Sequence, residues 1–153
     1  MKKLELLIPP PIVAAVIAIL MWQVAPILPA PEQLANHHII LSSIVAFAGF
    51  LSAAAGVFAV MKNKTTINPH SPQKTSRLVT SGIFSYTRNP MYVGILLVLG
   101  GWGLYLSHIA PLLMPLLFIL YMNRFQVIPE ERILEQKFGD EFVNYMRDTR
   151  RWI

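Results

Sequence analysis

Two short polar clusters carry the side chains that could do chemistry, Arg88-Asn89 and Glu130-Glu131. Together they offer a guanidinium fork, an amide and two carboxylates. This set suits a zwitterionic ligand, because carboxylates can bind an ammonium group and an arginine can bind a carboxylate or a phosphate. A salt-bridge network with ordinary helix-capping glutamates would use the same residues, and spacing alone slightly favours that structural interpretation.

Other kinds of chemistry find little support. The histidines are His37, His38, His70 and His108, and there is no cysteine. Because a metal site usually needs three or four converging ligands, we expect these histidines to lie at a membrane interface and expect no metal site. The sequence also lacks the patterns of P-loop ATPases, serine hydrolases and HExxH zinc proteases.

The composition predicts an integral membrane protein of one domain, residues 1–153. Apolar residues make up 54% of the chain and charged residues 14%, against roughly half and about a quarter in soluble proteins. The net charge of +5 is spread over loops and the C-terminal tail, without a basic stripe or an aromatic stacking platform. Nucleic acid is therefore not an expected partner.

Four apolar runs predict the helices that must position the two polar clusters, over about residues 11–28, 38–61, 91–106 and 109–122. The last two are 16 and 14 residues long, too short to cross about 30 Å of hydrocarbon unaided. We expect them to form a helical hairpin, broken at Ser107-His108, that extends into flanking residues or borders a thinned or solvated pocket. A hairpin returns the chain to its starting face, so the two polar clusters can meet.

Small residues predict close helix contacts in this bundle. The second run contains Ala46, Gly49, Ala53 and Gly56, among other small residues that let a neighbouring helix approach. The third run contains Gly94, Gly100, Gly101 and Gly103. Those glycines predict either close helix packing or approach of the backbone to a ligand.

The distribution of Lys and Arg predicts the topology. Lys2 and Lys3, the loop 62–88 and the C-terminal tail are basic, whereas the loop 30–37 contains no Lys or Arg. Because positive charge marks the cytoplasmic side, four crossings place both termini and the polar clusters there. We also expect a helix from Pro129 to Gly139 and another from about residue 141 to 150, so the fold class is an all-α polytopic membrane bundle with C-terminal amphipathic cytoplasmic helices.

Several motifs in the C-terminal half follow one another in a specific order. They are the segment 78–94, which ends in Arg88-Asn89-Pro90-Met91-Tyr92-Val93-Gly94, then Glu130-Glu131, the segment 138–145, and Arg151-Trp152. In this order and spacing they resemble the isoprenylcysteine carboxyl methyltransferase and phospholipid methyltransferase superfamily. The resemblance covers about half of the chain.

The resemblance implies a small helical membrane enzyme that uses S-adenosylmethionine and releases S-adenosylhomocysteine. Residues 1–61 would supply two N-terminal transmembrane helices, and residues 78–153 the cofactor-binding half. The cofactor-binding residues implied are Arg88, Asn89, Pro90, Met91, Tyr92, Gly94, Glu130 and Glu131. The resemblance assigns no catalytic residue.

Two departures from the family pattern bear on the acceptor. Position 89 is Asn, where the prenylcysteine enzymes typically have His, whereas phospholipid-methylating members also show Asn-Pro-Met-Tyr. A prenylcysteine substrate is therefore not assumed. The tail 148–152 lacks the usual proline, which leaves any substrate-binding arginine there unassigned.

The expected reaction is methyl transfer to a lipid or another small hydrophobic acceptor, on O, N or S. Glu130 or Glu131 would bind the ammonium group of the cofactor, which enters from the cytosol, while the acceptor enters from the membrane lipids. Two alternatives remain open. One is an NADPH-dependent membrane reductase, since some sterol reductases are similar in this region although their chains are generally much longer. The other is a membrane protein that keeps the fold without turnover.

Overall fold

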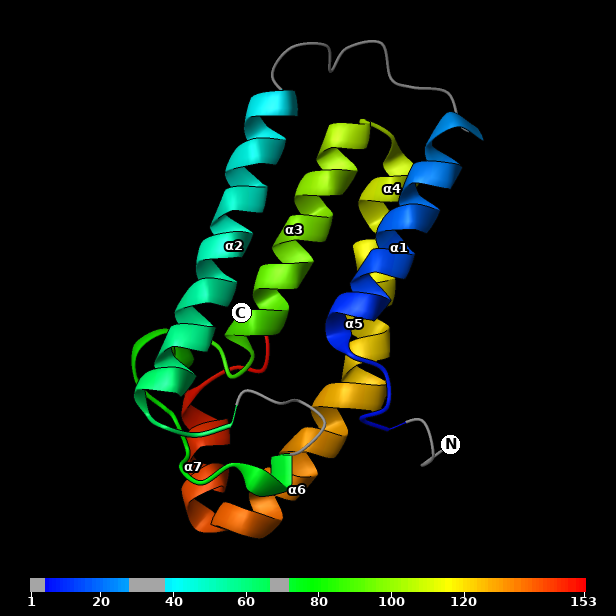
Figure 1. Cartoon of the computed structure of the whole chain (residues 1–153). Coiled ribbons are helices and arrows are strands. Elements are labelled where there is room, and N and C mark those ends of the chain that lie inside the picture. Colours follow the sequence, from blue (N-terminus) through cyan, green and yellow to red (C-terminus); the bar gives the residue numbers. More distant parts are fainter. Residues whose placement is uncertain (1–4, 28–37, 67–71) are drawn as a thin grey trace.

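The computed structural model describes residues 5–27, 38–66 and 72–153 (Figure 1). The predicted loop 30–37 and the residues Lys2, Lys3, His37 and His70 lie outside the described residues. Within the described residues every regular element is helical, which confirms the all-α fold. The α-helices are α1 (Pro10–Val24), α2 (His38–Lys62), α3 (Pro90–Leu106), α4 (Ile109–Leu113), α5 (Pro115–Met122), α6 (Ile128–Phe138) and α7 (Asp140–Asp148).

The membrane-spanning part is built from three long helices and one shorter helix. Pro10–Ile27, His38–Lys62 and Ile109–Phe138 are long and apolar enough to cross a membrane, and α3 is a shorter apolar helix. These helices confirm an integral membrane protein. Which side each terminus faces stays a prediction.

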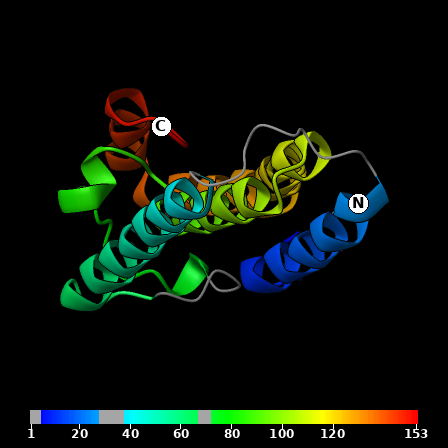
Figure 2. The ribbon, with the colours of Figure 1, turned by 90° about the horizontal axis from the view of Figure 1, so that it is seen from above.

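Helix α3 lies in the middle of the bundle, with α2 on one side and α1 on the other (Figures 1 and 2). The helices α1, α3 and α5 share an apolar core with the chain that follows α5. Its buried residues are Val13, Ile17, Met21, Tyr92, Leu99, Phe118, Met122 and Val127. This core holds the start of α3, which follows Arg88-Asn89, against the end of α5 and the chain that leads from α5 to Glu130-Glu131 in α6.

The predicted close contact between small residues is confirmed at α2 and α3. A Cβ atom added to Gly94 would lie 2.6 Å from the backbone oxygen of Gly49, and one added to Gly101 would lie 2.8 Å from that of Ser42. Since real Cβ atoms do not approach so closely, only glycine fits at these points. A Cβ atom added to Gly103 would lie 3.0 Å from Cα of Leu112 in α4, which is a tight but less restrictive contact.

The expected break at Ser107-His108 is confirmed, because Ser107 adopts a left-handed conformation with φ of 57° after α3. The helix expected from Pro129 to Gly139 is confirmed as α6, but no break separates it from the fourth crossing. The chain instead continues helically from Ile109 to Phe138, through a π-helical turn η5 (Asn123–Val127).

Pro129 explains this turn. Proline has no N–H group, so it cannot bond the carbonyl four residues earlier, and its ring crowds that carbonyl. Here the N–H of Ile128 bonds back five residues to Asn123. The carbonyl of Phe125, which a regular helix would pair with residue 129, accepts instead from the N–H of Leu6 at 2.9 Å. The wide turn thus ties the N-terminal segment to the fourth crossing, and such turns are frequent at functional sites.

Two short 3-10 helices, η3 (Pro72–Lys74) and η4 (Gly82–Ser85), lie in the polar segment between α2 and α3. A third, η2 (Ala25–Ile27), extends α1. Gly139 has a φ of 55° and joins α6 to α7, as expected for a glycine that ends a helix. The chain after α7 returns to the start of α3 (Figure 1).

Candidate functional site

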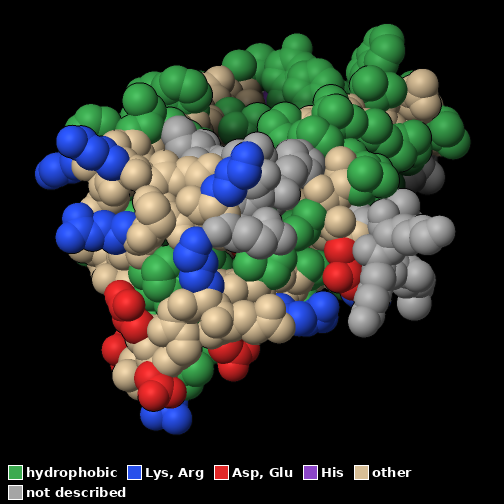
Figure 3. Space-filling model, turned by 60° about the horizontal axis from the view of Figure 1, so that its bottom comes forward, with side chains coloured by type: hydrophobic (Ala, Val, Ile, Leu, Met, Phe, Trp, Pro, Cys, Tyr) green, Lys and Arg blue, Asp and Glu red, His purple; other side chains and the backbone are tan. Residues whose placement is uncertain are grey.

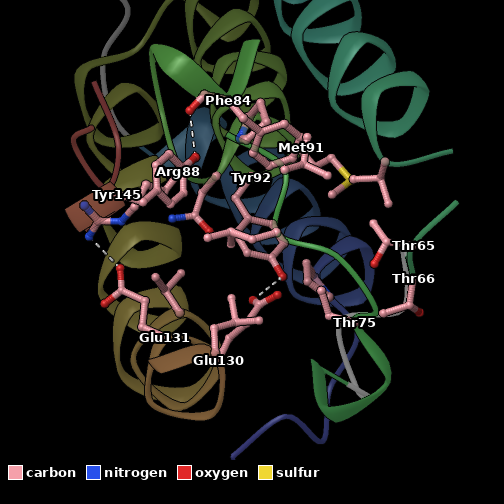
Figure 4. Close-up of a pocket in the computed structure, with 18 of the residues that line it drawn as sticks. Thr65, Thr66, Thr75, Phe84, Arg88, Met91, Tyr92, Glu130, Glu131 and Tyr145 are labelled. Carbon is pink, nitrogen blue, oxygen red and sulfur yellow. Dashed lines mark hydrogen bonds and ion pairs between the residues drawn. The ribbon is translucent and has the colours of Figure 1, made fainter. Parts of the chain in front are cut away.

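A cavity of about 480 Å³ lies where α1 begins, α2 ends and α3 meets α6 (Figure 4). Its polar lining comes from the motif residues and from the segment between α2 and α3: Thr65, Thr66, Thr75, Arg77, Arg88, Asn89, Tyr92, Glu130, Glu131 and Tyr145. Its apolar lining is Pro9, Pro10, Pro11, Val60, Leu78, Val79, Phe84, Pro90, Met91, Ile95, Val127, Leu134 and Phe142. The cavity therefore combines a few polar groups with largely apolar walls, as small-molecule sites do.

Glu130 points into the cavity beside Tyr92 (Figure 4). The Tyr92 hydroxyl donates to Oε2 of Glu130 at 3.0 Å, from the first turn of α3 to the first turn of α6. Gln126, whose side chain is buried in the π-helical turn, interacts with the same pair. The ion pairs found among the described residues do not include Glu130. Its carboxylate is thus available to a cation supplied by a ligand.

Glu131 has a different environment, because two arginines share it. Oε1 accepts from Nη2 of Arg88 at 2.7 Å and from Nε of Arg151 at 3.0 Å, and Oε2 accepts from Nη2 of Arg151 at 2.6 Å. The exposed fractions are 13% for the Glu131 side chain, 10% for Arg88 and 35% for Arg151. The two arginines neutralise this carboxylate within the protein, so its main contribution is to stabilise the fold.

The rest of the Arg88 guanidinium holds the C-terminal tail. Its Nη1 donates to the carbonyl of Met146 at 3.1 Å and to that of Thr149. Its Nε is buried and has no hydrogen-bond partner among the described residues. A buried donor without an acceptor is costly, and a ligand acceptor in the adjoining cavity would remove that cost.

The tail also contacts the segment before α3. The carbonyl of Arg151 accepts from the Asn89 side-chain amide at 2.9 Å and from the Thr87 hydroxyl at 3.2 Å. The indole of Trp152 donates to Oδ1 of Asn123 at 3.0 Å, in the π-helical turn. The last residues of the chain thus fasten the start of α3 to the junction of α5 and α6.

Tyr145 closes the side of the cavity next to Arg88 (Figure 4). Its hydroxyl donates to the carbonyl of Phe84 in η4 at 2.7 Å. Burial raises the pKa of this hydroxyl, so the group stays protonated and keeps donating. The bond connects α7 to η4, from which the chain runs into Arg88.

Most of the residues implied by the resemblance meet at this cavity. Arg88, Asn89, Pro90, Met91, Tyr92, Glu130 and Glu131 line it. Gly94 does not: it is buried against Gly49 and Ala53 of α2, so its role in the structure is helix packing. Arg88 and Glu131 form a salt bridge, as the salt-bridge interpretation of the two clusters predicts. Glu130 forms no ion pair among the described residues and faces the cavity, which suits binding of a ligand.

Sequence reasoning missed three contributors to the site. Arg151 was part of the resemblance without a role, and its pairing with Glu131 has no local signal. The threonines and Arg77 lie in the basic segment 62–88, whose composition predicts a cytoplasmic loop but no cavity. The prolines at positions 9–11 reach the cavity because the N-terminal segment is tied to Phe125.

Comparison with known proteins agrees with this geometry. The model of the phospholipid methyltransferase family matches residues 37–141, which include α2, α3, the fourth crossing and both polar clusters. The chain belongs to the phospholipid methyltransferase family. An uncharacterized protein of Haemophilus influenzae (strain ATCC 51907 / DSM 11121 / KW20 / Rd) is 44% identical over 63 residues, which is 41% of this chain and the whole of that protein. Family membership supports a membrane methyltransferase in general.

Proposed function

We propose that this protein is an S-adenosylmethionine-dependent methyltransferase that transfers a methyl group to a lipid or another small hydrophobic acceptor. The cavity between α1, α2, α3 and α6 is its proposed active site. The observation that carries the proposal is Glu130, a carboxylate that faces the cavity and has no ion-pair partner among the described residues.

The chain's own groups fit the amino-acid end of this cofactor. Its α-ammonium would pair with the Glu130 carboxylate, and its carboxylate would accept from Nε of Arg88, which lacks an acceptor among the described residues. The volume of about 480 Å³ lies within the roughly 300–1,000 Å³ of small-molecule sites. Glu131 would act indirectly, by holding Arg88 and Arg151 in place.

The cofactor, when bound, supplies an electrophilic methyl group on a sulfonium. The chain's contribution is then placement, because methyl transfer requires an in-line approach and positioning supplies much of the rate enhancement. Asn89 and Pro90 start α3 beside the cavity, and the Tyr92 hydroxyl fixes one oxygen of Glu130. The apolar walls from Phe84, Met91 and their neighbours exclude water and accept an apolar chain.

The acceptor would reach the cavity from the lipid. Residues of two membrane-spanning helices line it, Pro10 and Pro11 at the start of α1 and Val60 near the end of α2. These helices lie on either side of α3 (Figure 2). A hydrophobic acceptor could therefore stay partly in the membrane while its polar end meets the methyl group.

Calorimetric titration of S-adenosylmethionine and S-adenosylhomocysteine into detergent-purified protein tests the proposal. We expect saturable binding that Glu130→Gln weakens by at least about tenfold, the loss expected when a charge-assisted contact is removed. Glu135→Gln is the matched control, since Glu135 is an exposed residue of the same helix that does not line the cavity. That variant should bind like the unmodified protein.

A folded sample that binds neither compound would refute the methyltransferase assignment. A parallel titration with NADPH separates the alternatives: binding of NADPH alone would indicate a membrane reductase, and binding of none of the three a protein without turnover. Equal binding by the Glu130→Gln and Glu135→Gln variants would remove Glu130 from the cofactor site.

A further inference from the structure

Gln126 is a buried polar side chain that the proposed function does not use. It lies in the π-helical turn η5 and is only 2% exposed, and it is not among the residues that line the cavity. Burying an amide is costly unless its polar atoms form hydrogen bonds. The partners of Gln126 therefore indicate what this side chain does.

The side chain of Gln126 forms hydrogen bonds with both Tyr92 and Glu130. The Tyr92 hydroxyl uses its one hydrogen to donate to Oε2 of Glu130 at 3.0 Å (Figure 4). Because a carboxylate only accepts, the amide nitrogen of Gln126 donates in both of its bonds, and it carries the two hydrogens that this requires. The three side chains thus form a closed network in which Glu130 accepts from two neutral donors.

The helix that carries Gln126 explains how one residue reaches both partners. Gln126 and Glu130 belong to the continuous helical stretch Ile109–Phe138, and side chains four residues apart lie on the same face of a helix. That face meets the first turn of α3, which carries Tyr92. Gln126 is therefore about one turn before the carboxylate and beside the same tyrosine.

Two distant contacts hold the π-helical turn in place. The carbonyl of Phe125 accepts from the N–H of Leu6 at 2.9 Å, and Oδ1 of Asn123 accepts from the indole of Trp152 at 3.0 Å. The turn is thus attached to the N-terminal segment and to the C-terminal tail. A side chain on a backbone supported in this way can hold its partner more precisely than one on a loop.

The location of Glu130 explains why it needs these donors. Figure 3 shows Lys, Arg, Asp and Glu side chains on the surface of this end of the molecule, where water solvates them. Glu130 instead faces a cavity with largely apolar walls, where an ionised carboxylate without hydrogen bonds is strongly disfavoured. It forms no ion pair among the described residues. Neutral donors stabilise the carboxylate without cancelling its charge, so the charge stays available to a ligand.

We propose that Gln126 is a positioning residue that orients the Glu130 carboxylate toward the ammonium group of a bound ligand. This inference rests on the proposed function for the identity of that ligand, S-adenosylmethionine. The terminal torsion of a glutamate has a broad range, and Tyr92 contacts only one of the two carboxylate oxygens. The second donor, Gln126, restricts this torsion, so the carboxylate is already oriented when the ligand arrives.

Two ligands that differ only in the ammonium group test this role. Detergent-purified full-length protein is titrated by calorimetry with S-adenosylhomocysteine and with its deaminated analogue, in which hydrogen replaces the α-amino group. We expect the unmodified protein to bind S-adenosylhomocysteine at least about tenfold more tightly. Gln126→Met nearly conserves the side-chain volume but removes both donors, so it should reduce this preference at least about threefold. Its affinity for the deaminated analogue should be unchanged.

Gln136→Met is the matched control, because Gln136 is an exposed residue of α6 that does not line the cavity. It should keep the full preference for the ligand with the ammonium group. An unchanged preference in the Gln126→Met variant would overturn the positioning role. An equal loss of affinity for both ligands would also overturn it, since a general distortion of the cavity, and not a displaced carboxylate, produces that result.

Thermal unfolding without ligand separates this inference from the proposed function. If Gln126 holds Glu130, the fall in Tm caused by Gln126→Met should shrink by at least about half in a Glu130→Met background. Additive falls in Tm would overturn the contact. This coupling in a protein that binds neither ligand would refute the methyltransferase and sustain the role of Gln126. Equal affinity of the unmodified protein for the two ligands would leave cofactor binding intact and overturn the inference, because Glu130 would then hold no ammonium group.

Discussion

Glu131→Gln is the substitution that most directly tests the division of roles between the two adjacent glutamates. Glu131 accepts three hydrogen bonds from two arginines, at 2.6, 2.7 and 3.0 Å. The substitution removes its charge and turns an amide N–H₂ group toward a guanidinium. Arg88 and Arg151 would lose the anion that holds them, and with it the attachment of the C-terminal tail.

The magnitude follows from burial. Removing one partner of a buried ion pair costs about 3–5 kcal/mol, whereas an exposed pair contributes about 0.2–1 kcal/mol. Arg88 is 10% exposed and Arg151 35%, so the second pair is discounted for solvent screening. We expect Glu131→Gln to lower the free energy of unfolding by about 3 kcal/mol. At about 2–4 °C per kcal/mol for a chain of this size, Tm should fall by roughly 6–12 °C.

The assay is thermal unfolding in neutral detergent, followed by tryptophan fluorescence, with hydrogen exchange at residues 149–152 as a local readout. Glu130→Gln is the comparison, because its carboxylate pairs with no cation among the described residues and its removal should leave Tm unchanged or raise it. Exchange at the tail should quicken in the Glu131→Gln variant alone. Equal Tm values for the Glu131→Gln variant and the unmodified protein, or a larger loss for Glu130→Gln, would refute the reasoning.

Three further substitutions test the packing around the site, each by thermal unfolding. Gly94→Ala places a Cβ 2.6 Å from a backbone oxygen of α2 and should lower the free energy of unfolding by about 1–3 kcal/mol. The control is Gly100→Ala, whose added Cβ meets open space and should cause no loss. Equal losses of stability in the two variants would contradict the packing argument. Tyr145→Phe leaves the carbonyl of Phe84 without its donor at 2.7 Å, at a cost of about 1–3 kcal/mol, and an unchanged Tm would show that the bond does not stabilise the fold. Glu5→Gln weakens ion pairs to two arginines that are 42% and 50% exposed, so it should cost under about 1 kcal/mol, and a larger, salt-independent loss would be inconsistent with exposed pairs.

The helices were predictable because their signals are local. The third apolar run, expected over 91–106, became α3 (Pro90–Leu106), since Asn-Pro sets its start and Ser107 ends it in a left-handed conformation. The return of the chain through the following hairpin was enough to predict that the two polar clusters meet. The close approach of α2 and α3 followed from residues without bulky side chains.

The contacts that shape the surroundings of Glu130 and Glu131 could not be predicted, because they join distant parts of the chain. The pairing of Leu6 with the Phe125 carbonyl spans 119 residues and permits the π-helical turn before Pro129. Arg151 reaches Glu131 only because the tail returns to the start of α3. A periodicity or a turn signal concerns neighbours in sequence, so neither contact leaves a local pattern.

The two interpretations of the polar clusters are both needed, because they apply to different residues. Two arginines neutralise Glu131, and this leaves Glu130 as the carboxylate at the cavity without an ion pair among the described residues. Arg77 also lines this cavity, and it forms no ion pair among the described residues. A glutamate held by two arginines stabilises the walls of the cavity, and a neighbouring glutamate without an ion pair among the described residues can orient a ligand cation there. Methyl transfer between two bound molecules requires that kind of orientation.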